Sequence, residues 1–302
     1  MDIELVAEGL KFPEGPVAMA DGSVILVEIQ RRTLSRVTPD GKISVVAELG
    51  GGPNGAAVGP DGAVYVCNNG GFEWHEAGPL LVPGHKPANY AGGSIQRVDL
   101  ATGKFTTLYT ECDGRPLKGP NDLVFDRQGG FWFSDLAKST HDHKEYGALY
   151  YALPDGSRIV RVRDQLLSPN GVGLSPEETV LYSAETLTGR LWAFDVKAPG
   201  ELAPPTGFAP GRCIATLPGY QLADSLAVEA SGKICVATII NGGITAFDPN
   251  GTFEHFAFPD PIVTNICFGG DDMRTAWVTA SGTGKLYRAR WPRPGLKLNF
   301  NA

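Results

Sequence analysis

Six short apolar runs, each opened by a polar residue, share one pattern of polar and hydrophobic positions. The six openers are two carboxylates and four amides: Glu14, Asn54, Asn121, Asn170, Asp224 and Asn265. Most of these runs are followed by a turn rich in proline, aspartate and glycine and then by a second β-type run, as at residues 59–67. Short apolar runs bounded by such turns predict β-strands, and few segments keep the spacing of an amphipathic helix.

A second repeated segment lies downstream of each opener, so the two sets alternate one to one along the chain. Its six copies are β-type runs at residues 33–37, 93–98, 147–151, 189–194, 243–247 and 284–288. Further β-type runs, such as residues 44–47 and 106–109, complete the unit. Each unit therefore predicts four antiparallel strands.

The repeat predicts an all-β fold, a six-bladed β-propeller formed by a single domain of residues 1–302. The first two openers are 40 residues apart, at positions 14 and 54, which sets the length of a bare blade. The last unit ends soon after residue 287 without an outer strand of its own. We expect residues 3–6 to supply that strand, which would close the ring and remove exposed sheet edges.

Two longer units predict insertions on a face of the propeller. Residues 70–92 carry three aromatic residues and two histidines and are expected to form a loop. This loop would either cover the substrate or pack over the blade edge. Residues 138–146 include His141 and His143, an H-x-H pair that suits a transition metal but is expected to be solvated on so polar a loop.

Charge and composition narrow the classes of partner. The formal net charge is −7 and lysine and arginine form no dense run, so we expect no nucleic-acid partner. The N-terminus lacks an export signal and no run of about 18 apolar residues occurs, so we expect no membrane association. Five widely spaced cysteines without a C-x-x-C pair indicate a reducing compartment, and we expect a cytoplasmic protein.

The openers also predict chemistry, because the innermost strands of a propeller bring residues far apart in sequence together at the central channel. Crowded carboxylates repel one another unless a cation lies between them. Carboxylate and amide oxygens are the ligands of hard divalent ions such as Ca²⁺, Mg²⁺ or Mn²⁺, so the set indicates a metal site. Alternatively, the openers cap the strand starts by hydrogen bonding to turn amides, which applies more to Asn54 and Asn265 than to Glu14 and Asp224.

The motifs around the openers carry a family resemblance. They are Phe12-Pro13-Glu14-Gly15-Pro16 and the segments 119–126, 168–172, 223–228 and 264–270. With these motifs in this order, the chain resembles the family of senescence marker protein, gluconolactonase and luciferin-regenerating enzyme over most of its length.

The resemblance implies a six-bladed propeller with one divalent metal ion (Ca, Mg, Mn or Zn) that hydrolyses lactones or, in some relatives, phosphoester-like bonds. It implies that Glu14, Asn170 and Asp224 are metal ligands and that Asn121 is a further ligand or a substrate contact. We interpret Asn54 as a second substrate contact. Gly119 departs from the pattern, because animal sugar lactonases of this type carry an arginine two residues before the asparagine that matches Asn121.

The leading hypothesis is a metal-dependent, gluconolactonase-like hydrolase that opens a sugar lactone or another small cyclic ester. In this mechanism the metal polarises the lactone carbonyl, and Asp224 either deprotonates the attacking water or only orients it. Two alternatives remain: an organophosphate or phosphotriester hydrolase, and a non-catalytic propeller whose metal provides rigidity. No G-x-S-x-G elbow, Walker A or H-E-x-x-H motif competes with these hypotheses.

Overall fold

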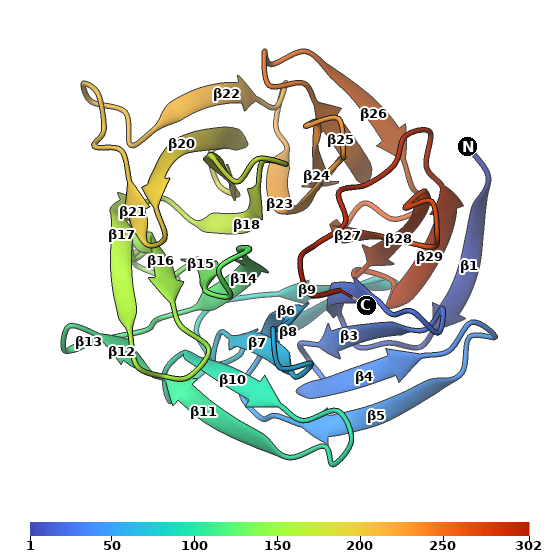
Figure 1. The fold of residues 1–302 in the computed structure, drawn as a ribbon. Coiled ribbons are helices and arrows are strands. Elements are labelled where there is room, and N and C mark those ends of the chain that lie inside the picture. Colours follow the sequence, from blue (N-terminus) through green and yellow to red (C-terminus); the bar gives the residue numbers. More distant parts are fainter. Residues whose placement is uncertain (302) are drawn as a thin grey trace.

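The repeated runs form six four-stranded antiparallel sheets, which are arranged as blades around a central axis (Figure 1). The computed structural model describes residues 1–301. Within them, no helix is both long and apolar enough to cross a membrane. The prediction of an all-β, six-bladed propeller is confirmed.

Each blade begins with its innermost strand at the axis. Blade 1 contains β2 (Pro13–Ala18), β3 (Val24–Glu28), β4 (Thr33–Val37) and β5 (Ile43–Glu48); blade 2 contains β6 (Pro53–Val58), β7 (Val64–Asn68), β10 (Ser94–Val98) and β11 (Phe105–Tyr109). Blade 3 contains β14 (Pro120–Phe125), β15 (Phe131–Asp135), β16 (Gly147–Ala152) and β17 (Ile159–Leu166).

The other three blades follow the same order. Blade 4 contains β18 (Pro169–Leu174), β19 (Val180–Glu185), β20 (Arg190–Ala198) and β22 (Arg212–Thr216), with the short β21 (Glu201–Leu202) also paired to β20. Blade 5 contains β23 (Leu222–Val228), β24 (Ile234–Ile239), β25 (Gly243–Phe247) and β26 (Phe253–Ala257). Blade 6 contains β27 (Val263–Gly269), β28 (Thr275–Ala280), β29 (Lys285–Arg290) and β1 (Ile3–Glu8).

The N-terminal strand closes the ring, as the sequence predicts. β1 pairs with β29 in an antiparallel register that runs from Ile3 opposite Ala289 to Glu8 opposite Lys285. Arg288 also forms an ion pair with Glu4 across this seam, with the closest N–O distance 2.7 Å. The last blade thereby obtains its outer strand from the opposite end of the chain.

Burial follows the position of a strand within its blade. Every residue of β2, β6, β14 and β18 is buried, whereas the outer strands β1 and β5 alternate between exposed and covered positions. Aromatic side chains fill the space between blades 2 and 3, where Tyr65 packs edge-on against Phe125 with ring centroids 5.0 Å apart. The inner strands are therefore held rigidly on both sides, which fixes the residues at their ends.

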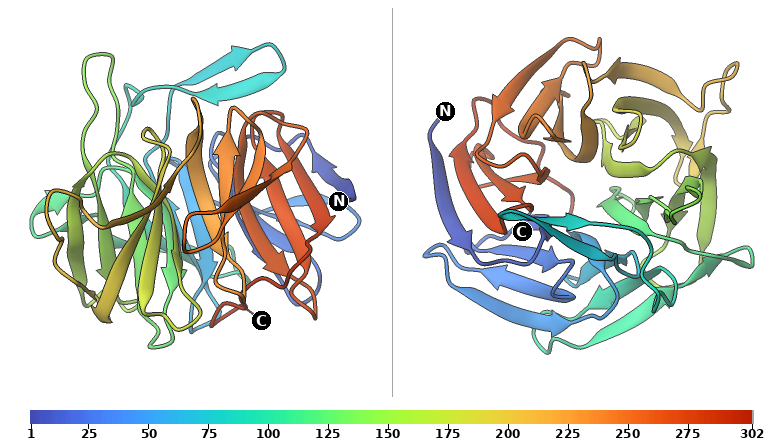
Figure 2. Two further views of the ribbon diagram at one scale, coloured as in Figure 1. Left: turned by 90° about the horizontal axis from the view of Figure 1, so that it is seen from above. Right: turned by 180° about the vertical axis from the view of Figure 1, so that it is seen from behind.

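The insertion at residues 70–92 contains a hairpin, so the prediction of an irregular loop is wrong for its central part. Strand β8 (Trp74–Ala77) pairs with β9 (Leu80–Pro83), and the hairpin lies over one face of the propeller (Figure 2). The ring of Trp74 packs on Phe12 with centroids 5.2 Å apart, and Leu81 N donates to Gly282 O of blade 6 at 2.8 Å. The insertion thus reaches across the propeller face from blade 2 to blade 6. A second small hairpin joins β12 (Glu111–Cys112) to β13 (Arg115–Pro116).

The C-terminal segment, residues 292–301, crosses the opposite face, which the sequence pattern does not predict (Figure 2). Leu296 N donates to Val228 O of blade 5 at 2.8 Å. Further along, Phe300 packs edge-on against Phe125 of blade 3, with centroids 5.8 Å apart. The tail therefore joins blades from different sides of the ring.

Candidate functional site

The six openers all lie near the start of the innermost strands. Glu14, Asn54, Asn121 and Asn170 are the second residues of their strands, and Asp224 and Asn265 are the third. Each is between 2% and 8% exposed. Because Pro53 at the start of β6 pairs with Asn68 at the end of β7, directly before the hairpin insertion, this end of the ring is on the hairpin face.

Glycine after the opener allows neighbouring inner strands to approach closely in three of the six blades. A Cβ atom on Gly15 would lie 2.6 Å from Ala56 N, and one on Gly171 would lie 2.6 Å from Leu226 N. A Cβ on Gly55 would clash with Asn121 O and lie 2.7 Å from Asp122 Cα. These positions tolerate only hydrogen, which explains why glycine follows the openers at 14, 54 and 170.

Glu14 and Asn265 form a direct link between blades 1 and 6. Asn265 Nδ2 donates to Glu14 Oε2 at 2.8 Å, and Gly15 N donates to the same oxygen at 2.8 Å. Asn265 Oδ1 accepts a hydrogen bond from Ile266 N at 2.8 Å. Both ends of the Asn265 amide are therefore engaged within the protein, as the capping interpretation predicts.

Asn170 and Asp224 form the corresponding link between blades 4 and 5. Asn170 Nδ2 donates to Thr186 Oγ1 at 3.1 Å, which orients the amide oxygen away from that loop. Ser225 Oγ, next to Asp224 in the chain, donates to Asn170 Oδ1 at 3.4 Å. The main-chain oxygen of Asn170 accepts a hydrogen bond from Ser134 Oγ of blade 3.

Asn121 differs from the other amides in one respect that matters for binding. Its Oδ1 atom is buried and has no hydrogen-bond partner among the described residues. A buried carbonyl oxygen without a partner is unfavourable by about 1–3 kcal/mol, so an unfilled acceptor at this position indicates a ligand. Asn54 is also buried, on the adjacent strand β6.

A third carboxylate, Asp122, belongs to the same site and was missed by the sequence analysis. It directly follows Asn121, at the place where three other blades have glycine. Burial, and secondly the negative charge of Glu14, raises the pKa of Asp122 to about 8. The signal was present in the sequence, because Asn-Asp at this position breaks the Asn-Gly pattern of blades 2 and 4.

The carboxylates of the site disfavour one another's charge. Burial raises the pKa of Glu14 to about 7, although the hydrogen bond from Asn265 partly opposes the shift. Burial, followed by the charge of Glu14, raises the pKa of Asp224 well above its ordinary value. A cation among these groups would supply the missing compensation and return them to the ionised form.

The donor set fits a hard divalent ion. Glu14 and Asp224 supply carboxylate oxygens, Asn170 supplies an amide oxygen, and Asn121 supplies the unpartnered one. Elsewhere in residues 1–301 no three histidine, cysteine, aspartate or glutamate side chains form a group suited to a metal ion. In particular, His141 and His143 are exposed on their loop, in keeping with the solvated interpretation.

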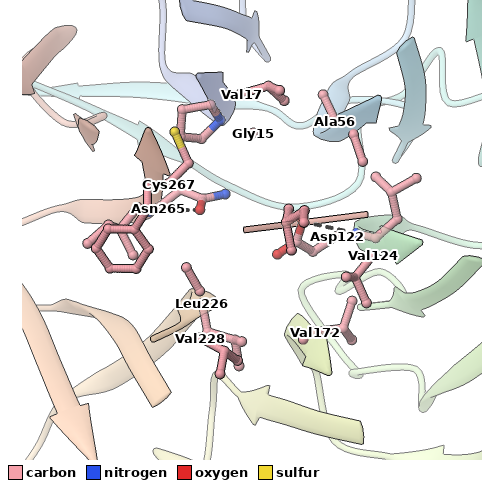
Figure 3. Close-up of a pocket in the computed structure, with 18 of the residues that line it drawn as sticks. Gly15, Val17, Ala56, Asp122, Val124, Val172, Leu226, Val228, Asn265 and Cys267 are labelled. Carbon is pink, nitrogen blue, oxygen red and sulfur yellow. Dashed lines mark hydrogen bonds between the residues drawn. The ribbon is translucent and has the colours of Figure 1, made fainter. Parts of the chain in front are cut away.

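A small cavity lies in the channel on the side of the ring away from the hairpin (Figure 3). Its volume is about 80 Å³, and Asp122 and Asn265 contribute polar atoms to a wall that is otherwise mostly apolar. Leu296 and Leu298 of the C-terminal segment also line it. The tail therefore narrows the channel below the ring, so we expect access to the ring from the hairpin face.

The cysteines are not suited to nucleophilic chemistry. All five are free, and Cys67 and Cys235 are fully buried. Burial raises the pKa of Cys267, which lines the cavity, to about 12. The thiols of these strand residues are therefore protonated at neutral pH and act as small apolar groups.

Fold and site together define a six-bladed propeller with an oxygen-lined polar ring at the entrance of its channel. Residues 12–282 match the family described as the SMP-30/Gluconolactonase/LRE-like region. The chain belongs to this family, as its motifs indicate.

Relatives extend over most of the chain. It is 26% identical to a gluconolactonase of Zymomonas mobilis, over 92% of this chain and 79% of the relative. It is 28% identical to lactonase drp35 of Staphylococcus haemolyticus, over 82% of this chain and 70% of the relative. The structure of regucalcin from Agrobacterium tumefaciens, described as a calcium-binding protein, has the same fold, with a TM-score of 0.73 at 18% identity over 97% of both chains.

Proposed function

We propose that this protein is a divalent-metal-dependent lactonase whose active site is the ring of strand openers. The observation that carries the proposal is the meeting of buried carboxylates of raised pKa with the unpartnered oxygen of Asn121. The lactonase and gluconolactonase relatives support the reaction, and the calcium-binding relative supports the cofactor. Its identity among Ca²⁺, Mg²⁺, Mn²⁺ and Zn²⁺ is part of the test below.

In this proposal Glu14, Asn121, Asn170 and Asp224 hold the ion, and Asn54 contacts the substrate together with Asn121. A bound divalent ion supplies Lewis-acid polarisation of the lactone carbonyl. Asp224 orients the attacking water and accepts its proton as the water oxygen bonds to the carbonyl carbon. The ring C–O bond then breaks, and the leaving alkoxide takes up a proton to give a hydroxy acid.

The test is proton release from a panel of lactones by the metal-loaded protein, with a phosphotriester in the same panel. The proposal predicts turnover of at least one lactone, abolished by a chelator and restored by one of the four ions. Turnover of the phosphotriester alone would instead indicate an organophosphate hydrolase. Absence of any turnover with the ion bound would indicate a non-catalytic propeller.

A further inference from the structure

A set of exposed apolar side chains borders the ring on the hairpin face and is not used by the reaction above. We call Leu187, Tyr220 and Ile240 the apolar rim; they are 51%, 78% and 52% exposed. Leu187 lies between β19 and β20, Tyr220 lies between β22 and β23, and Ile240 follows β24. All three loops are at the ends of the blades where the openers lie, because Glu185 pairs with Pro169 and Ile239 pairs with Leu222.

The rim is directly connected to the proposed metal ligands. Thr186, which accepts the hydrogen bond from Asn170 Nδ2, immediately precedes Leu187. Tyr220 lies four residues before Asp224 in the chain. The loops that carry these two side chains are themselves joined, since Leu217 N donates to Gly189 O at 2.7 Å.

Half-buried apolar residues fill the step between the ring and the rim in blades 5 and 6. Leu222 is two residues before Asp224, so it lies about 7 Å further toward the mouth along the strand. Its register partner is Ile239, which also forms a bridge with Ile262 of blade 6. Leu80 of the hairpin continues this surface: a Cβ placed on Gly282 would lie 3.0 Å from Ile262 Cβ and 3.1 Å from Leu80 Cδ2.

Ile240 carries an independent sign of function in its backbone. Its φ angle is +84°, a conformation that suits glycine or asparagine and is strongly disfavoured for a β-branched residue. Such a conformation is typically retained where it serves a site. Since half of the side chain is exposed, packing within the protein does not account for isoleucine at this position.

We propose that the substrate is a lactone bearing an apolar substituent, alkyl or aryl, which packs against Leu187, Tyr220 and Ile240 while the ester group lies at the ring. This inference rests on the proposed lactonase function and deepens it. An apolar surface gives no hydrogen bonds to the hydroxyl groups of a sugar, but it gains from every methylene that it removes from water. These three residues are then determinants of specificity.

The first test compares kcat/KM for γ-butyrolactone, γ-heptalactone, γ-nonalactone and glucono-δ-lactone. A methylene that contacts the rim is expected to raise kcat/KM up to about fourfold. We therefore expect γ-nonalactone to exceed γ-butyrolactone by at least tenfold and to exceed the sugar lactone. Turnover that is independent of chain length, or that favours the sugar lactone, overturns this inference alone. No lactone turnover overturns the proposed function as well.

The second test uses Ile240→Gly, which removes the apolar side chain and the backbone strain together. We expect an unchanged or higher Tm, and a loss in kcat/KM at least fivefold greater for γ-nonalactone than for γ-butyrolactone. Met273→Gly is the matched control, because Met273 also has a positive φ of 55° but lies beside the C-terminal segment on the opposite face, where its oxygen accepts from Gly295 N. An equal loss on both substrates in Ile240→Gly, or a shift of the same ratio in Met273→Gly, contradicts the inference.

Discussion

At the scale of single residues, Asp224 joins two roles that substitution separates. Asp224→Asn keeps the size of the side chain and an oxygen for the ion but removes the proton acceptor. We expect kcat for lactone opening to fall about a thousandfold with metal still bound, measured by proton release together with metal content. The control is Asp260→Asn, a buried carboxylate of the hairpin face that binds Ile262 N and Thr283 N. Full activity of metal-loaded Asp224→Asn would exclude Asp224 as the base.

Gly55 tests how far the ring depends on close packing of inner strands. In Gly55→Ala the new methyl group meets main-chain atoms of Asn121 and Asp122, which have little room to move. We expect the free energy of unfolding to fall by about 1–3 kcal/mol and metal affinity to fall as Asn121 shifts, measured by thermal unfolding and calorimetric titration.

The matched control for this substitution is Gly62→Ala. Gly62 also has a positive φ, +75°, but a Cβ there meets nothing within 4 Å. It should lower stability without changing metal affinity. Equal metal affinity in the two variants would show that strand spacing at Gly55 does not position the ring.

Residues of the site differed in how readily the sequence revealed them. The openers were predicted because repetition marks them, and the capping alternative for Asn265 was also correct. Asp122 escaped because its importance arises from burial beside Glu14, which sequence spacing does not report. The close approach at Gly15, Gly55 and Gly171 likewise depends on the distance between blades.

At the scale of elements, the hairpin β8–β9 is attached through a few contacts outside its own pairing. Trp74 contributes the aromatic contact with Phe12, and Lys138 Nζ donates to Gly71 O at 2.7 Å beside the ring of Phe72. An aromatic pair is worth about 0.5–1.5 kcal/mol beyond the area that it buries. The hairpin is therefore expected to open locally more easily than the blades do.

Trp74→Ala should increase that local opening. We expect amide exchange in residues 74–83 to accelerate about tenfold while exchange in the inner strands stays unchanged, measured by hydrogen exchange with mass spectrometry. Tyr146→Ala, which removes an exposed aromatic ring from the other insertion, should leave hairpin exchange as in the wild type. Uniform acceleration across all blades in Trp74→Ala would contradict a locally attached hairpin.

The elements predicted well are those that repeat. Strand β4 spans residues 33–37 and β25 spans residues 243–247, as expected, because six copies of one pattern reinforce each other. The hairpin and the C-terminal segment have no such copies. Their positions depend on long-range contacts, such as Leu81 with Gly282 and Phe300 with Phe125, which no local pattern encodes.

At the scale of the whole molecule, the buried carboxylates couple stability to pH and to metal. The pKa of Glu14 is raised from 4.5 to about 7 and that of Asp122 from 3.8 to about 8. Between the unfolded and folded values the native protein binds more protons than the unfolded chain, so the contribution of these groups to the free energy of unfolding falls as pH rises. This contribution is full below about pH 4 and is lost by about pH 8.

We therefore expect the Tm of chelator-treated protein to fall by several degrees between pH 5.5 and pH 7, and saturating divalent ion to flatten that dependence. The measurement is differential scanning calorimetry at both pH values with and without the ion. Other groups, such as Lys138 with its pKa lowered to about 7 by burial, contribute to both series and cancel in the comparison. Parallel pH profiles in the two series would show that the ion does not bind at these carboxylates.

The central claim is that one ion, held in the ring of strand openers, enables lactone opening. Its most direct test is to titrate metal-stripped protein with the divalent ion that supports turnover, and to measure bound metal and the initial rate of lactone hydrolysis in the same samples. The account predicts no activity in the stripped protein and a rate that rises in proportion to occupancy, reaching its maximum at one ion per chain. Full activity without metal, or full occupancy without activity on any lactone, would contradict it.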